Sequence, residues 1–269
     1  MIDGTVGMGG HAEAVLEGSG ADVRLLGLDA DPGALEQAAV RLGRFGDRVR
    51  LIHATFADLE TVAASHGVAE ARAILLDLGV SSWQLDASGR GFSFQRDEPL
   101  DMRLDPTRGA TAAELVNGLD EAELARLLYE YGEERYARRI ARVIVRRRPL
   151  ATTGDLVAAV RAAVPRQAWP RHLHVATRTF QAVRMAVNDE PGALRRALEA
   201  GPRLLAHGGR LGVISFHSGE DRMVKQTFRT LERAGYAPLE PSPLTPGDDE
   251  VRANPRARSA KLRVLERLP

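Results

Sequence analysis

The chain has 269 residues, of which 44% are hydrophobic and 27% are charged, and its formal net charge at pH 7 is +1. This length is sufficient for one large or two modest domains with a sizeable buried core. The sequence contains no cysteine, which excludes a disulfide framework, a zinc–thiolate site and a thiol nucleophile. It has neither a secretory signal nor an apolar run of about twenty residues, so we expect a soluble, cytoplasmic protein that does not bind membranes.

The most informative segment lies close to the start of the chain. It reads Asp3-Gly-Thr-Val-Gly-Met-Gly-Gly-His11 and combines an acid with four glycines. Because glycine lacks Cβ, such a loop turns tightly and allows a ligand to lie against the main chain. A helix-compatible segment follows over 11–17, and an apolar strand over 23–29 ends in Asp29. This arrangement is typical of a nucleoside-binding βαβ unit, in which the acid at the strand end binds ribose hydroxyls.

The spacing of the glycines distinguishes between two classes of cofactor. It differs from the G-x-G-x-x-G of dinucleotide sites, where a pyrophosphate binds at the helix N-terminus. An acid at Asp3, before the glycines, favours a ligand with a cationic amino group and no phosphate. S-adenosylmethionine, which has a ribose, an ammonium and a sulfonium, is therefore the expected cofactor. An ordinary glycine-rich turn and the site of an NAD-dependent oxidoreductase are the alternatives.

Strands and helices alternate along the first third of the chain. A helix begins at Asp31-Pro32, with the proline at an early position where its missing N–H costs nothing. Strands are predicted over 49–53 and 73–78. Apolar strands separated by helices indicate a parallel sheet that is covered on both faces. Ligands bind beyond the carboxyl ends of such strands, where we expect Asp3, Asp29 and Asp77 to lie.

The pattern changes after Asp77. Residues 83–110 are rich in Gly, Pro and Asp and are predicted to form loops. Helical periodicity then extends from residue 112 to about residue 187, with Asp120 as the N-cap of a helix over 121–131.

The alternation of helix and strand resumes near the C-terminus. A helix over 193–205, closed by Gly208-Gly209, precedes a strand over 210–215 and a helix over 221–233. The Pro-rich segment 237–258 is predicted to be a surface excursion, and residues 259–267 to form an edge strand. We therefore predict an α/β domain formed by 1–97 and 183–269. An all-helical insertion over 98–182 is predicted to recognise the substrate.

Positive charge is concentrated in the helical part of the chain. Residues 135–184 carry twelve arginines and a single acid, Asp155. Within a helix whose apolar face is formed by Tyr136, Ile140, Val143 and Ile144, the arginines occupy the other side. Guanidinium groups bind phosphates in bidentate fashion, and little acid is present to neutralise them. We predict that this face binds RNA, with a merely solvated surface as the alternative; the candidate residues are Arg138, Arg139, Arg142 and Arg146.

Two polar segments follow predicted strands and are candidates for chemistry. The first, Asp77-Leu-Gly-Val-Ser-Ser-Trp83, stands where enzymes that methylate an exocyclic amine carry a hydrogen-bond acceptor. An acceptor for the amine protons restores the nucleophilicity of a nitrogen whose lone pair is delocalised into a ring. We predict this role for Asp77, with a helix or turn cap as the alternative.

The second segment is Ile214-Ser-Phe-His-Ser-Gly-Glu-Asp-Arg222. There His217 is predicted either to relay a proton or contact an RNA phosphate, or to be a structural histidine. No metal is expected at His172-x-His174, because no third ligand has a matching spacing.

Almost the whole chain resembles the bacterial methyltransferases of the RsmH or MraW type, which modify N4 of a cytosine in small-subunit (16S) ribosomal RNA near the decoding centre. Beyond the glycine loop, the resemblance rests on six segments: Leu76-Asp-Leu-Gly-Val-Ser-Ser82, Arg90-Gly-Phe-Ser-Phe94, Pro99-Leu-Asp-Met-Arg-Leu-Asp-Pro-Thr107, Arg178-Thr-Phe-Gln-Ala182, Ile214-Ser-Phe-His-Ser218 and Asn254-Pro-Arg-Ala-Arg-Ser-Ala-Lys-Leu262.

The resemblance implies a Rossmann-like class I S-adenosylmethionine-dependent fold with a helical insertion. It also implies a partly assembled small subunit as substrate and is compatible with a homodimer. The cofactor contacts that it implies are Gly9, Gly10, His11, Asp29, Phe56, Asp77 and Gln84.

Some features depart from the family pattern. Members usually carry a further segment before the position of Asp3, with a His-x-Pro-Val sequence, so we expect the first strand to be largely missing. Trp83 replaces a common proline, and Gly219 replaces a common leucine. We expect methylation of the exocyclic N4 amine of a cytosine in 16S rRNA. The alternatives are a non-enzymatic ribosome-binding factor with a degenerate methyltransferase fold, or a methyltransferase acting on another nucleic acid or on protein.

Overall fold

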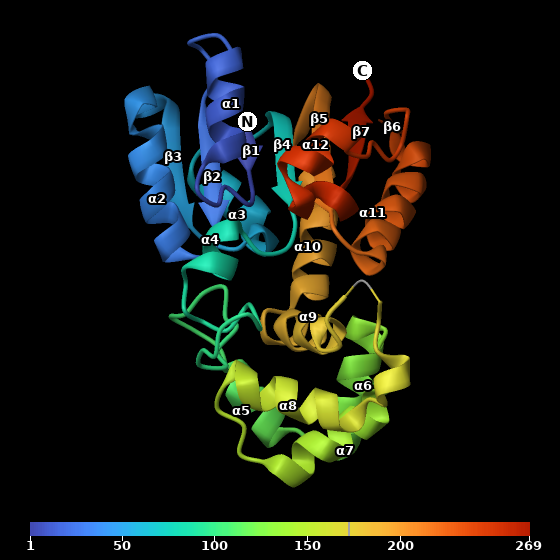
Figure 1. Ribbon diagram of the computed structural model, residues 1–269. Coiled ribbons are helices and arrows are strands. Elements are labelled where there is room, and N and C mark those ends of the chain that lie inside the picture. The colour runs from blue at the N-terminus through green and yellow to red at the C-terminus, as the bar shows by residue number, and fades with distance from the viewer. Residues whose placement is uncertain (172) are drawn as a thin grey trace. The chain divides into compact units, whose positions relative to one another are not determined.

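A computed structural model describes residues 1–171 and 173–269, and the chain divides into two compact units (Figure 1). Unit 1 comprises Met1–Gly79 and Pro191–Pro269, and unit 2 comprises Val80–Glu190. Unit 2 extends beyond the 98–182 expected for the insertion, on both sides. The reason on the N-terminal side is that Phe92 packs into the same core as the helices, although it belongs to an irregular segment.

Unit 1 contains a seven-stranded sheet in the order β3-β2-β1-β4-β5-β7-β6. Strands β1 to β5 are parallel, whereas β7 runs antiparallel to both β5 and β6. The first strand has only two residues, as expected, yet it pairs with both β2 and β4. The strands are β1 (Ile2–Asp3), β2 (Leu25–Asp29), β3 (Val49–His53), β4 (Ala71–Asp77), β5 (Leu205–Ser215), β6 (Tyr236–Pro238) and β7 (Lys261–Arg267).

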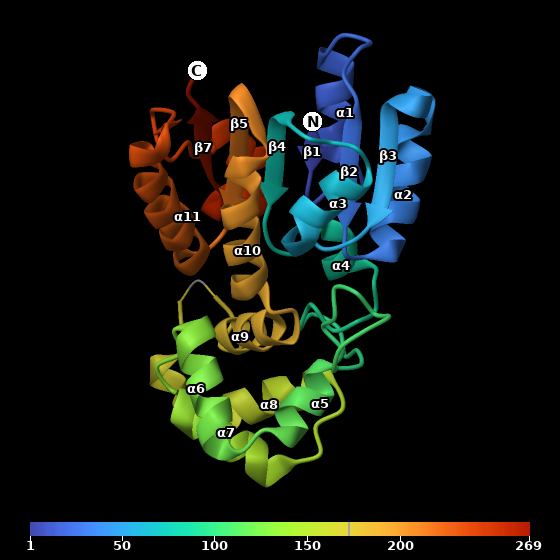
Figure 2. The ribbon, with the colours of Figure 1, turned by 180° about the vertical axis from the view of Figure 1, so that it is seen from behind.

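Helices cover both faces of this sheet, which confirms the predicted layering. Helices α1 (Gly10–Gly18) and α2 (Pro32–Leu42) pack with Leu25 on one face, in front in Figure 1. On the other face, in front in Figure 2, Leu26 packs with helices α3 (Leu59–Ser65), α10 (Glu190–Arg203) and α11 (Ser218–Leu231). Adjacent strand residues such as Leu25 and Leu26 join different clusters because successive side chains point to opposite faces.

The predicted end of one helix is wrong. The helix expected over 193–205 ends at Arg203, and β5 begins at Leu205, so Gly208-Gly209 lies within a strand. Gly208 has φ +71°, and the pairing of β4 with β5 shifts its register between Ala71 and Ala73. The glycines therefore form a bulge in the strand rather than a helix cap. Sequence alone does not separate these cases, because both require a positive φ.

The prediction of an edge strand near the C-terminus is also wrong. Strand β7 lies between β5 and β6, and its outer neighbour comes from the Pro-rich segment that was expected to be a surface excursion. That segment also contains a short helix, α12 (Asp248–Ala253), and Leu244 forms an isolated bridge with Leu262. A three-residue strand such as β6 is too short to show an alternating pattern in the sequence.

Unit 2 contains helices joined by irregular segments and is built around its own core. Asp120 caps α6, where its side chain accepts the N–H of Glu123 at 2.7 Å. The helices of this part are α4 (Ser82–Asp86), α5 (Ala112–Gly118), α6 (Glu121–Gly132), α7 (Ala137–Arg147), α8 (Thr153–Ala163) and α9 (Thr177–Val187). Among the described residues of both units, no helix is long and apolar enough to cross a bilayer.

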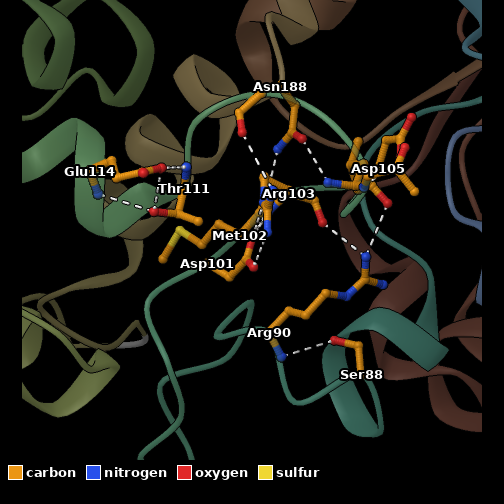
Figure 3. Close-up of polar contacts among 12 residues, drawn as sticks. Ser88, Arg90, Asp101, Met102, Arg103, Asp105, Thr111, Glu114 and Asn188 are labelled. Atoms are coloured by element: carbon orange, nitrogen blue, oxygen red, sulfur yellow. Dashed lines mark hydrogen bonds and ion pairs between the residues drawn. The ribbon is translucent and has the colours of Figure 1, made fainter.

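The irregular segment before α5 is held by a polar network (Figure 3). Asn188, just after α9, accepts the N–H of Leu104 at 2.7 Å and donates to the carbonyl of Met102 at 2.8 Å. The guanidinium of Arg90 donates to the carbonyls of Arg103 and Leu104. Met102 is fully buried and has φ +59°, a backbone region that side chains rarely adopt. The Pro99–Thr107 motif is thus part of the framework of unit 2.

Candidate functional site

Three acids stand at the carboxyl ends of neighbouring strands of unit 1. Asp3 ends β1, Asp29 ends β2 and Asp77 ends β4. Because parallel strands end at one edge of a sheet, the fold brings these carboxylates to the same side. This grouping is the one expected from the sequence.

The glycine loop connects β1 to α1 close to these acids. Gly7 and Gly9 have φ +52° and +85°, in the left-handed region that favours glycine. At Gly4, a Cβ would lie 2.6 Å from Leu76 Cδ2 and 3.1 Å from Phe56 Cβ, so a side chain does not fit there. The loop is therefore pressed against the sheet at Gly4, and its last glycine, Gly10, is exposed.

Asp29 connects the loop to the second strand. Its Oδ2 accepts the N–H of Gly7 at 2.7 Å, and its Oδ1 accepts the N–H of Asp31 at 2.9 Å. Burial raises the pKa of Asp29 to about 6. Each carboxylate oxygen has a second lone pair, so Asp29 is still able to accept hydrogen bonds from ribose hydroxyls.

Asp3, His11 and Asp77 form the second half of the cluster, together with Thr5. His11 Nε2 lies 3.3 Å from Asp77 Oδ2, and this hydrogen bond raises the pKa of His11. Thr5 donates its N–H to Asp3 at 3.1 Å, and its hydroxyl accepts the N–H of Asp77 at 2.6 Å. Thr5 was not predicted from the sequence, because a threonine in a glycine loop gives no signal that it contacts a distant strand.

One oxygen of each of two acids in this cluster has no hydrogen-bond partner within the described part of the chain. These atoms are Asp3 Oδ2 and Asp77 Oδ1, and both are buried. Burial raises the pKa of Asp3 to about 7. Buried acceptors without partners are costly, so they indicate places where a ligand donates hydrogen bonds or carries positive charge.

Comparison with known proteins identifies the family. The MraW methylase family matches residues 1–268. The chain belongs to this family. Three similar relatives are each named ribosomal RNA small subunit methyltransferase H. The protein of Geotalea uraniireducens is 49% identical, with 99% of this chain and 92% of that protein covered. The protein of Symbiobacterium thermophilum is 51% identical and that of Kosmotoga olearia 49% identical. Each alignment covers 99% of this chain and 90% of the relative.

Among solved structures, an rRNA methylase from Streptococcus thermophilus aligns with 100% of this chain and 86% of its own, at 14% identity and a TM-score of 0.46.

Membership of the MraW methylase family confirms the resemblance drawn from the sequence. The fold class is confirmed as well: the seven-stranded sheet has helices on both faces and an antiparallel strand β7, as in Rossmann-like class I methyltransferases.

The remaining residues predicted for cofactor binding in this family member have distinct environments. Phe56 follows β3 and lies against Gly4, next to the loop. Gly10 begins α1 directly after Gly9. Gln84 belongs to unit 2, where its carbonyl accepts the N–H of Ser81 at 2.8 Å in the capping box of α4. Its assignment to the cofactor stays a prediction.

His217, the second predicted catalytic residue, is engaged locally at the start of α11. Its Nδ1 accepts the N–H of Glu220 at 3.4 Å, and its Nε2 lies 3.0 Å from Glu220 Oε1. Glu220 also accepts the N–H of Phe216 at 2.9 Å, so it fixes the turn after β5. This is the geometry of a helix cap, and a catalytic role for His217 stays a prediction.

The predicted RNA-binding arginines lie on α7 in unit 2, and all four are exposed. Its buried face is formed by Ile140, Val143 and Ile144, together with two alanines. Concerning metals, His172 lies outside the described residues. His174 stacks on Phe94 and lies 3.2 Å from Arg161. Across residues 1–171 and 173–269, no three His, Asp or Glu side chains are grouped as a metal site.

Proposed function

We propose that this protein transfers a methyl group from S-adenosylmethionine to the exocyclic N4 amine of a cytosine in 16S rRNA, near the decoding centre. The observation that carries the proposal is the cluster of Asp3, Asp29 and Asp77 around the glycine loop, with two buried oxygens that lack partners. Family membership and the names of the relatives support small-subunit rRNA as the substrate.

The donor set fits S-adenosylmethionine. We assign Asp29 to the ribose hydroxyls, and the exposed Gly10 with its neighbour Gly9 to main-chain contacts with the ligand. Asp3 and Asp77 supply the negative charge that a ligand with an ammonium and a sulfonium requires. Phe56 is assigned to the adenine because it lies against the loop. When bound, the cofactor supplies an electrophilic methyl group on sulfur.

Asp77 is assigned to the amine. His11 holds its Oδ2, whereas its Oδ1 is buried without a partner among the described residues. An N–H of the cytosine amine donating to Oδ1 draws the nitrogen lone pair out of conjugation. The other contribution of the chain is positioning, because the reaction requires the amine in line with the methyl and the exclusion of water. The target cytosine has to leave its stack to reach such a site.

Replacing Asp77 tests this assignment. We expect Asp77→Ala to lower the rate of methyl transfer to small ribosomal subunits, at saturating cofactor, by at least about 100-fold, because it removes the acceptor of the amine. Cofactor affinity, measured by calorimetry, separates loss of chemistry from loss of binding.

Asp22→Ala is the matched control, because Asp22 is exposed in the turn before β2, far along the strand from its carboxyl end. It should leave the rate unchanged. A near-normal rate for Asp77→Ala would show that another group accepts the amine proton.

The alternative functions have their own tests. Failure of the folded protein to bind S-adenosylmethionine in a calorimeter would favour a non-enzymatic ribosome-binding factor. Mass spectrometry of ribosomal RNA from cells with and without the gene tests the substrate. Unchanged N4-methylcytidine would remove the proposed activity and leave a methyltransferase for another nucleic acid or for protein.

A further inference from the structure

Helices α6 and α7 of unit 2 enclose a groove of about 830 Å³. Its α6 wall is formed by residues 121, 122, 125, 126 and 129, and pairs of these that are three or four positions apart lie on one face of the helix. Two of them, Ala122 and Ala125, are small and leave space between the helices. The complete lining is Glu121, Ala122, Ala125, Arg126, Tyr129, Glu134, Arg135, Tyr136, Ala137, Arg138, Arg139 and Arg142.

The groove combines cationic side chains with an exposed aromatic ring. Its five arginines outnumber its two acids, and both acids have local partners. Glu121 pairs with Arg142 at 3.3 Å, and Glu134 is buried and accepts the N–H of Tyr136 at 2.9 Å. Tyr129 is 66% exposed, so it contributes little to the core of unit 2.

The groove is formed by the turn between the two helices. Glu133, the residue after α6, has φ +48°. Gly132 allows the close approach of α9, because a Cβ there would lie 2.6 Å from the carbonyl oxygen of Arg178. This sharp turn brings Tyr129, near the end of α6, and Arg135 to Arg139, near the start of α7, to the same groove.

We infer that this groove binds one unstacked nucleotide of a single-stranded RNA segment, with its base on Tyr129 and its phosphates on Arg135, Arg138 and Arg139. The inference rests on the proposed function and adds a second nucleotide to it, because the groove residues belong to unit 2 and the acids of the cofactor site to unit 1. A volume of this size is typical of sites for small ligands and suits a nucleotide rather than a duplex. Stacking on an aromatic ring beside cationic side chains is the usual recognition of single strands.

Replacing Tyr129 tests the stacking. Tyr129→Ala should weaken the affinity for small ribosomal subunits, measured by filter binding, between about 5-fold and 100-fold. Tyr129→Phe retains the ring and should bind like the natural protein. The salt dependence should be the same for all three proteins, because no charge is changed. Equal affinity of Tyr129→Ala and the natural protein would overturn the inference.

Replacing Arg138 tests the phosphate contacts. Arg138→Ala should weaken binding and reduce the slope of log affinity against log salt by about 0.7 to 1, as expected when one phosphate contact is lost. Arg229→Ala removes the same charge from an exposed position of α11 and should leave the slope unchanged. Equal slopes for the two variants would contradict a phosphate contact in the groove.

A photo-crosslinking amino acid at position 129 distinguishes RNA from protein. With small subunits as the probe, we expect crosslinks to 16S rRNA at a nucleotide other than the methylated one, mapped by reverse transcription. Crosslinks to a ribosomal protein alone would overturn the inference. Both binding and crosslinking are measured without methyl transfer. A protein that crosslinks to rRNA but does not methylate it would refute the proposed function and support RNA binding in the groove. A Tyr129→Ala variant that methylates rRNA and binds subunits with unchanged affinity would support the proposed function and refute RNA binding in the groove.

Discussion

Asp3 is a buried acid with an oxygen that no described residue hydrogen-bonds, at the centre of the proposed cofactor site. Burial raises the pKa of Asp3, and the nearby charges of Asp77 and Asp29 raise it further. The backbone N–H of Thr5 and the charge of His11 lower this pKa, because they favour the ionised carboxylate. The folded protein therefore holds a proton on Asp3 that the unfolded chain releases at lower pH. An ionised carboxylate at this position lowers stability, because it is poorly solvated.

This cost predicts how Asp3→Asn changes the dependence of stability on pH. The pKa of Asp3 rises from 3.8 in the unfolded chain to about 7 in the folded protein. The associated stability is present below pH 3.8 and is lost as pH rises through 7. Relative to Asp3→Asn, the natural protein should therefore lose up to about 4 kcal/mol of unfolding free energy between pH 4 and pH 8.

Urea unfolding of both proteins across this range measures the difference. Asn at this position still accepts the N–H of Thr5, so the loop geometry is retained. A difference that does not vary with pH would show that Asp3 is ionised throughout. Asp3→Asn should also bind S-adenosylmethionine more weakly above pH 7, where the natural protein carries the charge.

Among the secondary-structure elements, α9 depends on Asn188 for its attachment to the irregular segment before α5. The side-chain oxygen of Asn188 accepts the N–H of Leu104 at 2.7 Å. Its amide nitrogen donates to the carbonyls of Met102 and Arg184, each at 2.8 Å. One amide thus satisfies three backbone groups that have to be paired when they are shielded from water. Regular structure does not supply these partners, because Leu104 and Met102 lie outside helices and strands.

We therefore expect Asn188→Ala to lower the free energy of unfolding by about 2–4 kcal/mol, since it leaves three backbone groups without this partner. Thermal or urea denaturation of the full chain measures the effect. Asn117→Ala offers a comparison, because Asn117 makes a similar double contact with the N–H and carbonyl of Leu150. A loss below about 0.5 kcal/mol for Asn188→Ala would show that water replaces the amide.

The molecule as a whole is almost neutral, yet its charge is segregated. The overall net charge is +1, whereas residues 135–184 carry twelve arginines and one acid. The acids of the proposed cofactor site are buried or half-buried, and the arginines of α7 are exposed. Salt screens exposed charges far more than buried ones. The two proposed ligands should therefore respond differently to ionic strength.

We expect the affinity for small ribosomal subunits to fall steeply with salt, and the affinity for S-adenosylmethionine to change little. Contacts of four arginines with phosphates predict a slope of log affinity against log salt of about −3 to −4. Filter binding and calorimetry across about 50–300 mM potassium chloride measure the two responses. A shallow slope for the subunits would mean that the arginines form a solvated face and do not contact RNA.

The amino-acid sequence by itself determined the elements that carry strong local signals. The helix start at Asp31-Pro32, the cap at Asp120, the strand over 49–53 and the apolar face of α7 all agree with the structure. These signals are local, because caps and periodic apolar residues act within a few residues. The acids at the strand ends were also predicted, since a parallel sheet places its carboxyl ends at one edge.

Only the tertiary structure decided features that depend on residues far apart in the chain. The bulge at Gly208-Gly209 follows from pairing with β4, and the inner position of β7 from the three-residue strand β6. The contact of Thr5 with Asp77 spans 72 positions, and the groove beside Tyr129 exists only because a turn folds α7 back on α6. Such contacts leave no periodic trace in the sequence. They are selected by the burial and hydrogen bonding of the complete fold.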